Sequence, residues 1–326
     1  MLSRRHTLAS AVSAALATTL PAQAQTAYPD RPVKILVGYA PGGGVDIVAR
    51  LLAERMRLAL GQAVLVENRP GASAMIAAQA VTQAPADGYT LLLAAAGEIA
   101  ANPALFKQRM AYVPQRDLAP ISLIATVPNV LVTSPSTPVR NPADLVQLAK
   151  QRRDLSYASS GIGNPQHLAG ELLNRMAGTD ILHVPYRGAA PALTDVAAGR
   201  VTLNFSSLGP ALPLIREGKL RAVGVTSAQR MPQILDVPAL AEGPGLAGYE
   251  LLNWFGLFAP AKVPQPIVTR LAEVVRAALA DADLASKLTD QGALPQAMAP
   301  DAFRDFVTAE TAKFTKIIED GGITAE

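Results

Sequence analysis

The sequence contains no cysteine, so the protein forms no disulfide bond, has no thiolate nucleophile and binds no metal through sulfur. Aromatic residues make up only 5% and charged residues only 17% of the 326 residues, and the net charge is +3. This balance does not favour nucleic-acid binding, which needs a concentrated basic face. Because half of the residues are hydrophobic, the composition indicates a folded globular protein rather than a disordered or fibrous one.

Hydrophobic runs of membrane-spanning length are also missing. The apolar stretch from Leu8 to Leu20 has 13 residues, fewer than the ~20 that a spanning helix needs. It follows Arg4 and Arg5 and precedes Ala22-Gln23-Ala24, which is the pattern of a cleaved export signal over residues 1–24. The two arginines fit a general secretory signal and a twin-arginine signal equally well. We therefore expect a periplasmic protein.

From Pro32 onward, short β-rich runs alternate with amphipathic helical stretches, which predicts an α/β fold with parallel sheets. The expected strands are 33–39, 63–66, 90–95, 155–158, 181–184, 201–205 and 220–226. The expected helices are 46–60, 74–83, 142–151, 165–176, 189–198, 210–217, 266–279 and 300–319.

Two extended apolar stretches, 121–133 and 251–259, fall outside this alternation. Such a pair is typical of a chain that crosses to a second domain and later returns. We expect a discontinuous first domain over residues 25–126 plus 252–326 and a second domain over residues 127–251.

A glycine-rich turn, Tyr39–Asp46, joins the first expected strand to the first expected helix. Glycine backbone lets a ligand approach closely, and the free N–H groups at the start of a helix attract an anion. The turn lacks the Lys-Ser/Thr of a P-loop and carries Ile47 at the third glycine of a dinucleotide fingerprint. Two alternatives stay open: the turn only reverses the chain, and Asp46 only complements the helix dipole.

A second segment, Ser159–His167, follows the same logic in the other expected domain. Two helix N-termini would then face each other across a cleft. Charge-assisted hydrogen bonds contribute ~1.5–3 kcal/mol each, so about six donors would outweigh an association cost of ~4 kcal/mol or more and give micromolar affinity for a carboxylate.

The sequence offers little for catalysis. We expect His167 and His183 to be structural, and two isolated histidines do not favour a metal site or cofactor. Gly71–Met75 approaches the G-x-S-x-G nucleophile motif but lacks its second glycine, so hydrolysis is the runner-up function. We expect Trp254 to serve in packing.

An ordered series of motifs carries a family resemblance. The segments are Tyr28-Pro29 with 32–37, Ala40–Asp46, Val66–Ala72, Asp87–Leu92, Gln166–Glu171, His183–Gly188, Pro191–Asp195 and Trp254–Pro260. The chain resembles the periplasmic solute receptors of tripartite tricarboxylate transporters, known as Bug receptors, over nearly its whole mature length.

This resemblance implies a two-domain, type II periplasmic binding protein, or Venus flytrap, with two strands crossing the hinge and a small carboxylate as ligand. It also implies a membrane permease of one large and one small subunit as partner, with sensing as an alternative role, and we expect a monomer. The candidate ligand-binding residues are Tyr39, Ala40, Pro41, Gly43, Val45, Asp46, Ala95, Ala96, Glu98, Ser160, Gly161, Asn164, Gln166, His167, Tyr186 and Ser206.

Three segments depart from the family pattern: Ala95–Glu98 lacks the usual hydroxyl residues, Gly163-Asn164-Pro165 replaces Gly-Thr-Ser, and Ser206-Ser207 stands where many relatives have an Asp. If Glu98 faces the cleft, its charge would repel a second carboxylate and favour a zwitterion such as an amino acid. The other interpretation is a solvated surface glutamate.

Overall fold

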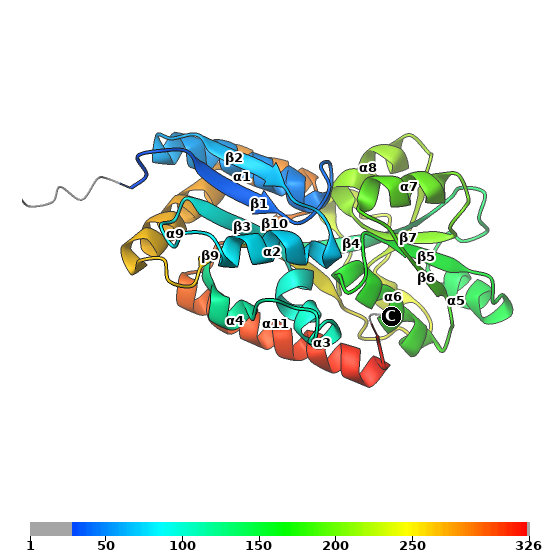
Figure 1. Ribbon diagram of the computed structural model, residues 1–326. Helices are drawn as coiled ribbons and strands as arrows, with labels where there is room; N and C mark the ends of the chain where they lie inside the picture. Colours follow the sequence, from blue (N-terminus) through cyan, green and yellow to red (C-terminus); the bar gives the residue numbers. More distant parts are fainter. Residues whose placement is uncertain (1–27, 325–326) are drawn as a thin grey trace, which may run out of the picture.

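The computed structural model describes residues 28–324, and the predicted leader, residues 1–24, lies outside the described residues. Figure 1 shows two α/β lobes side by side, with strand β4 (Leu118–Thr133) running between them. The chain thus has the predicted two-domain α/β architecture.

The first lobe is built on a mixed sheet in the order β2-β1-β3-β9-β4, with β10 on the outer side of β4. Its strands are β1 (Val33–Val37), β2 (Val64–Asn68), β3 (Thr90–Ala95), β9 (Leu252–Pro260) and β10 (Leu294–Pro295). Its helices are α1 (Gly44–Leu60), α2 (Met75–Thr82), α3 (Asn102–Leu105), α4 (Pro114–Asp117), α9 (Gln265–Leu279), α10 (Ala282–Asp290) and α11 (Pro300–Gly321). Two short turns join them, a 3-10 turn η1 (Ala72–Ala74) and a π-helical turn η2 (Gly97–Ala101).

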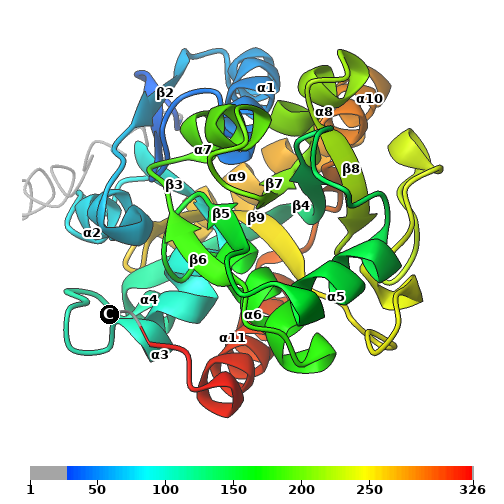
Figure 2. The ribbon, with the colours of Figure 1, turned by 90° about the vertical axis from the view of Figure 1, so that its right-hand side faces the viewer.

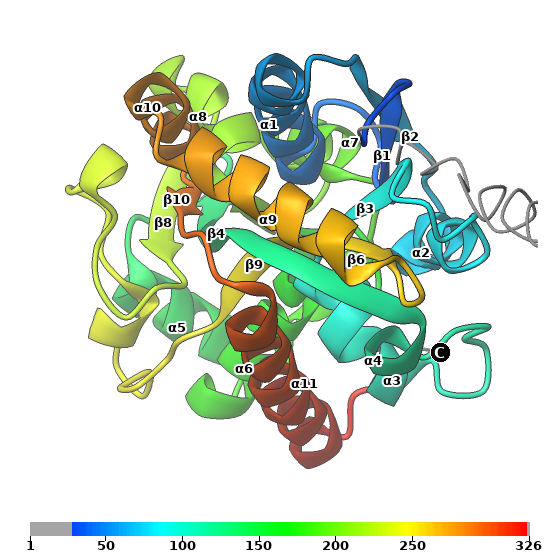
Figure 3. The same ribbon diagram turned by 90° about the vertical axis from the view of Figure 1, so that its left-hand side faces the viewer.

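The two faces of this sheet pack against different helices because side chains alternate along a strand. Val33, Ile35 and Val37 of β1 pack with α1, α9 and α10, whereas Leu36 packs with α2 and α11. Figure 3 shows α9 lying across one face of the sheet beside α1. This packing fixes the start of α1 at the carboxyl end of β1.

The second lobe has a sheet in the order β8-β4-β7-β5-β6. Its strands are β5 (Ser156–Ser159), β6 (Leu182–Pro185), β7 (Leu203–Ser207) and β8 (Arg221–Val225), and its helices are α5 (Pro142–Gln151), α6 (Pro165–Ala177), α7 (Ala189–Ala197) and α8 (Leu208–Arg216). Helices α7 and α8 cover one face, and α5 and α6 cover the other (Figure 2).

Strand β4 belongs to both sheets. Residues 118–128 pair with β9 in the first lobe, and residues 129–133 pair with β7 and β8 in the second. The two stretches that interrupted the βα alternation, 121–133 and 251–259, therefore lie in adjacent antiparallel strands.

The predicted elements occur with shifts of a few residues at their ends. Two are reproduced without any shift, β3 and α5, and the predicted cap of α5 is present because the Asn141 side chain accepts the Asp144 N–H. The sequence analysis missed η2, α3, α4, α10 and β10. Four of them, η2, α3, α4 and β10, have two to five residues, too few to show a period. Helix α10 has nine residues, and its buried Leu284 and Leu288 are four positions apart, as on one face of a helix, but this signal was missed.

The lobes contact each other at several points. The Ser73 hydroxyl donates to the Ile162 carbonyl at 2.7 Å, and the Gly209 N–H donates to the Gln291 carbonyl at 2.9 Å. Helix α11 runs under the first lobe and ends against α6 of the second lobe (Figure 1). The structure is therefore a closed arrangement of the lobes. No helix within residues 28–324 combines the length and apolarity required to cross a bilayer.

Candidate functional site

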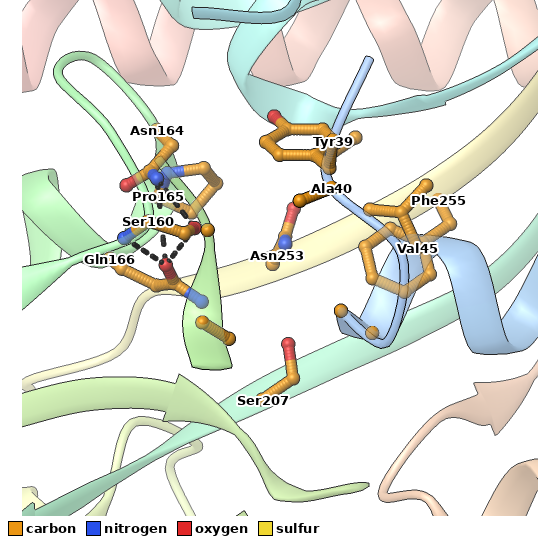
Figure 4. A pocket seen from close by; sticks show the side chains of 15 residues that line it. Tyr39, Ala40, Val45, Ser160, Asn164, Pro165, Gln166, Ser207, Asn253 and Phe255 are labelled. Atoms are coloured by element: carbon orange, nitrogen blue, oxygen red, sulfur yellow. Dashed lines mark hydrogen bonds between the residues drawn. The ribbon is translucent and has the colours of Figure 1, made fainter. Parts of the chain in front are cut away.

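Two adjoining cavities lie between the lobes. The hinge cavity has a volume of about 30 Å³ and is lined by Tyr39, Ala40, Gly43, Gly44, Val45, Ala95, Ser160, Asn164, Pro165, Gln166, Gly188, Ala189, Ser207, Asn253 and Phe255 (Figure 4). The loop cavity has about 500 Å³ and is lined by Gly38, Tyr39, Ala40, Pro70, Gly71, Ala72, Ser73, Ala74, Ser160, Gly161, Ile162, Asn164, Tyr186 and Arg187. Both lobes contribute to each cavity, so closure of the lobes forms both.

The first glycine-rich turn presents the start of α1 to the hinge cavity. Gly43 is the N-cap, no side chain caps the helix, and the first intrahelical bond runs from Ile47 N–H to the Gly43 carbonyl. The N–H groups of Gly44 and Val45 therefore have no intrahelical acceptor. Together with the helix dipole, they are chemically suited to an anion and need no basic side chain for it.

Asp46 holds this turn in place from behind. Its carboxylate accepts hydrogen bonds from Gly42 N–H at 2.9 Å and from Asn68 Nδ2 at 2.9 Å, and it pairs with Arg50. Burial alone would raise the pKa of Asp46, but the hydrogen bonds from Arg50, Gly42 and Asn68 lower it below its ordinary value. Asp46 is 3% exposed and lines neither cavity, so it is an anchor of the loop.

The second loop uses its backbone donors internally. Ser160 N–H donates to Gln166 Oε1 at 3.0 Å, Gly163 N–H to His167 Nδ1 at 3.1 Å, and His167 N–H to Asn164 Oδ1 at 2.9 Å. Asn164 is thus the N-cap of α6. The expectation of a second set of free backbone donors is not met for these groups.

Side chains supply the remaining donors of the hinge cavity. Gln166 Nε2, Ser207 Oγ and Asn253 Nδ2 donate to no other residue within the part of the chain that the structure describes. Figure 4 shows Gln166 and Ser207 projecting from the second lobe toward the turn of Ala40 and Val45. A carboxylate between them would meet neutral donors from both lobes and from hinge strand β9.

Sequence comparison agrees with this geometry. A profile of the family described as "Tripartite tricarboxylate transporter family receptor" matches residues 48–323.

The chain belongs to this receptor family.

Relatives share nearly the full length of the receptor. A UPF0065 protein of the tcbD-tcbE intergenic region of Pseudomonas sp. (strain P51) is 38% identical, covering 99% of this chain and 96% of its own. Protein BugT of Bordetella pertussis is 33% identical, covering 93% of this chain and 92% of its own. The family is one of periplasmic solute receptors, as the motifs indicated.

Solved structures show the same fold. Rpa4515 of R. palustris, solved with adipate, has a TM-score of 0.88 and 38% identity, covering 91% of this chain and 99% of its own. MatC (Rpa3494) of Rhodopseudomonas palustris, solved with malate, has a TM-score of 0.83 and 34% identity, covering 89% of this chain and 100% of its own. Family and fold indicate a solute-binding protein rather than an enzyme.

The receptor brings ten of the sixteen predicted site residues to the wall of a cavity: Tyr39, Ala40, Gly43, Val45, Ala95, Ser160, Gly161, Asn164, Gln166 and Tyr186. Six others line neither cavity: Pro41, Asp46, Ala96, Glu98, His167 and Ser206. Of these six, Pro41 is exposed and the other five are buried.

Ser207 occupies the place that the sequence analysis gave to Ser206. Both follow Phe205 on β7, where neighbouring side chains point to opposite faces. Ser207 lines the hinge cavity, while Ser206 is 1% exposed and donates to the Ser207 carbonyl. A shift of one residue along a strand changes the face, and the motif alone does not fix that register.

Asn253 and Gly44 are further cavity residues that the sequence analysis missed. Asn253 directly precedes the buried Trp254. Because neighbouring side chains on a strand point to opposite faces, the position of Trp254 could have predicted that Asn253 faces the other side of the sheet. The Asn253 Oδ1 atom accepts the Ala96 N–H at 3.3 Å, which leaves its Nδ2 for the cavity.

His167 and His183 stack under the second loop, with ring centroids 3.9 Å apart. Burial lowers the pKa of His167 to about 4 and, together with the neighbouring His167, that of His183 to about 3, so both rings are neutral. Ser159 Oγ lies 2.8 Å from His183 Nε2, but Ser159 has no exposed surface and neither residue lines a cavity. This serine–histidine pair therefore supports the loop and lies outside both cavities.

Glu98 also lies away from the ligand space. It has no exposed surface, its Oε2 accepts the Tyr39 hydroxyl at 2.8 Å, and its Oε1 accepts the Ala95 N–H at 2.9 Å. Burial raises the pKa of Glu98 to about 7, although these two hydrogen bonds lower it. Its position behind Tyr39 fits neither a direct contact with a zwitterion nor a solvated surface glutamate.

Charge is nearly absent from the site. Among the described residues, Tyr39 is the only ionisable side chain in the wall of the hinge cavity, and Arg187 is the only cation in the wall of the loop cavity. Within residues 28–324, Arg187 forms no ion pair, and no cluster of three or more His, Asp or Glu residues is arranged to hold a metal.

Proposed function

We propose that the receptor captures one small carboxylate between its lobes, with an ionised carboxyl group in the hinge cavity and the rest of the molecule in the loop cavity. The observation that carries this proposal is the set of neutral donors around the hinge cavity: the first-turn N–H groups of α1, Ser207 Oγ, Gln166 Nε2 and Asn253 Nδ2. Hydrogen bonds to a charged group contribute ~1.5–3 kcal/mol each, which supports micromolar affinity.

The two volumes define the shape of the ligand. About 30 Å³ at the hinge is the space of one water or a few heavy atoms, and the adjoining 500 Å³ is within the range of small-molecule sites. Arg187 in the loop cavity favours a second negative group at the far end. Adipate and malate, found in related structures, are both dicarboxylates of this kind.

The proposal extends to location and partners. Residues 1–24 act as the export signal, and residues 25–126 plus 252–326 close against residues 127–251 as two rigid units. The released, monomeric receptor delivers its ligand in the periplasm to the large and small membrane subunits of a tripartite tricarboxylate transporter.

Native mass spectrometry with a mixed panel tests the ligand class. The panel contains adipate, malate, citrate, glutamate and, as a matched neutral control, adipamide. We expect reversible one-to-one complexes with dicarboxylates, no complex with adipamide and no product. Binding of adipamide as strongly as adipate, or turnover of any panel member, would overturn the proposal.

A further inference from the structure

Glu98 is a buried carboxyl that adjoins the ligand space without entering it. Its two hydrogen-bond donors, the Tyr39 hydroxyl and the Ala95 N–H, both belong to residues that line the hinge cavity. Two residues, Tyr39 and Ala95, therefore each link Glu98 to the space where a carboxylate would bind.

No positive charge from the residues that the structure describes compensates this carboxyl. Within the described part of the chain, no Lys, Arg or His lies within ion-pair distance of Glu98. Its titratable neighbours are Tyr39, from the loop after β1, and Tyr112, from the loop before α4, whose hydroxyl donates to the Glu98 carbonyl at 2.9 Å.

The other elements around η2 contribute neutral groups: Ser73 of η1, Asn102 of α3, Asn253 of β9 and the buried Phe303 and Val307 of α11. The charged side chains of α11 point elsewhere: they are exposed or, like Glu310, paired with a neighbour such as Lys313. The charge of Glu98 is thus uncompensated when the lobes are closed.

The Tyr39 hydroxyl can serve only one acceptor at a time. When Glu98 is ionised, its Oε2 takes the hydroxyl hydrogen, and Tyr39 offers only oxygen lone pairs to the cavity. When Oε2 carries a proton, it donates to Tyr39 Oη, and the hydroxyl hydrogen is free to turn toward a ligand carboxylate.

We propose that Glu98 is a positioning residue that couples ligand capture to the uptake of one proton, through the hydrogen bond between its side chain and Tyr39. This inference rests on the proposed function, because it requires an anion in the hinge cavity. The proton moves from solvent to Glu98 Oε2, the hydroxyl hydrogen of Tyr39 reorients, and no other bond changes. Burial places the pKa of Glu98 at about 7, so the exchange falls in a range where the ligand, with ordinary carboxyl pKa values of ~4, stays ionised.

Isothermal titration calorimetry between pH 6 and 8.5 tests the coupling, with adipate as the probe and malate where adipate does not bind. We expect the Kd to rise above pH 7, by up to ~10-fold per pH unit. Titrations at pH 8.5 in buffers of different ionisation enthalpy should show the uptake of close to one proton per ligand.

Glu98→Gln separates this role from simple packing. The amide keeps the acceptor for Ala95 N–H and gives Tyr39 Oη a permanent donor, so the Kd should be independent of pH and, at pH 8.5, at least ~10-fold lower than that of the unmodified receptor. If Glu98→Gln does not fold, Tyr39→Phe serves instead, with weaker binding at pH 6 and a flat pH profile.

Glu171→Gln is the matched control. Glu171 accepts the Tyr157 hydroxyl at 2.5 Å in the second lobe, as Glu98 accepts Tyr39, but it lines neither cavity. Its variant should keep the pH dependence of the unmodified receptor. A pH-independent Kd in the unmodified receptor, or the same slope in Glu98→Gln, would overturn the coupling while leaving carboxylate binding intact. Absence of binding at every pH would instead overturn the proposed function.

Discussion

The two glycine-rich loops meet the same cavity but hold their donors differently. The first loop leaves the N–H groups of Gly44 and Val45 free and is anchored from behind by Asp46. In the second loop, the N–H groups of Ser160, Gly163 and His167 donate hydrogen bonds to side chains of the same segment.

In the proposed function, the first lobe would therefore hold the carboxylate through backbone N–H groups and the second lobe through side chains. The first loop should be sensitive to added atoms, because its donors need close approach by the ligand. The second lobe should be sensitive to lost polar groups and to whatever disturbs its internal hydrogen bonds.

We expect the largest effect, a change in the free energy of unfolding with pH, from the two histidines that support the second loop. Burial holds the native pKa values of His167 and His183 at about 4 and about 3, below the ordinary histidine value of 6.5. The unfolded chain then binds more protons, so the free energy of unfolding falls as the pH drops from about 6.5 toward 4, by on the order of 2 kcal/mol per histidine.

Glu98 acts in the opposite direction, because its raised pKa favours the native state as the pH falls from about 7 toward 4.5. The Glu98→Gln substitution removes this contribution, so urea unfolding of this variant at pH 7 and pH 4.5 measures how the histidines change the free energy of unfolding. In the double variant Glu98→Gln/His183→Gln, the free energy of unfolding should depend less on pH than in Glu98→Gln alone. If it depends on pH equally in both, the stacked histidine pair is not neutral in the native state.

A methyl group at Gly44 should clash with the second lobe and prevent the two lobes from closing fully. A Cβ at Gly44 would lie 2.9 Å from Ser207 Oγ and 3.0 Å from Ser207 Cβ, across the cleft. Overpacking costs ~1–3 kcal/mol, so we expect Gly44→Ala to bind adipate ~10–100-fold more weakly.

Gly43→Ala is the matched control, because its Cβ would lie 3.5 Å from the Ala40 carbonyl of the same loop and would not touch the other lobe. Calorimetry compares the two Kd values, and small-angle scattering compares compaction by the ligand. Equal affinities for the two variants would contradict the closed arrangement described above.

Ser207 tests the side-chain half of the comparison. Loss of a hydroxyl that donates to a carboxylate costs ~1.5 kcal/mol or more, so Ser207→Ala should raise the Kd by ~10-fold. Ser206→Ala, on the opposite face of β7, should leave the Kd unchanged. The reverse result would place Ser206 in the site, as the motif alone suggested.

The sequence predicted the architecture because its signals are local and repeated. Alternating periods, the cap at Asn141 and the two stretches outside the alternation identified the two-domain α/β fold. The loops were also predictable, since glycine runs at strand ends mark places where backbone is accessible.

Which side chain faces the cavity was less predictable, because that depends on strand register and on three-dimensional partners. The difference between Ser206 and Ser207 is one residue, and the partner of Glu98, Tyr39, is 59 positions away in the sequence. The internal capping of the second loop by Gln166 and Asn164 likewise requires the folded loop.

The smallest effect is expected at Ser73, where the two lobes touch beside the loop cavity. Ala72, Ser73 and Ala74 have φ values of 46°, 51° and 68°, which non-glycine residues adopt with strain, and the Ser73 hydroxyl donates to Ile162 across the cleft at 2.7 Å. Ser73→Ala keeps the strain and loses the hydrogen bond, so adipate affinity should fall by ~3–10-fold, as expected for a bond that contributes ~0.5–1.5 kcal/mol.

Ser73→Gly loses the same hydrogen bond but relieves the strain at this position. Its adipate affinity should therefore match that of Ser73→Ala, whereas its thermal unfolding should occur at a higher temperature than that of Ser73→Ala. If instead both variants bind as tightly as the unmodified receptor, the Ser73 bond does not favour closure, and the free donors around the hinge cavity alone determine the affinity.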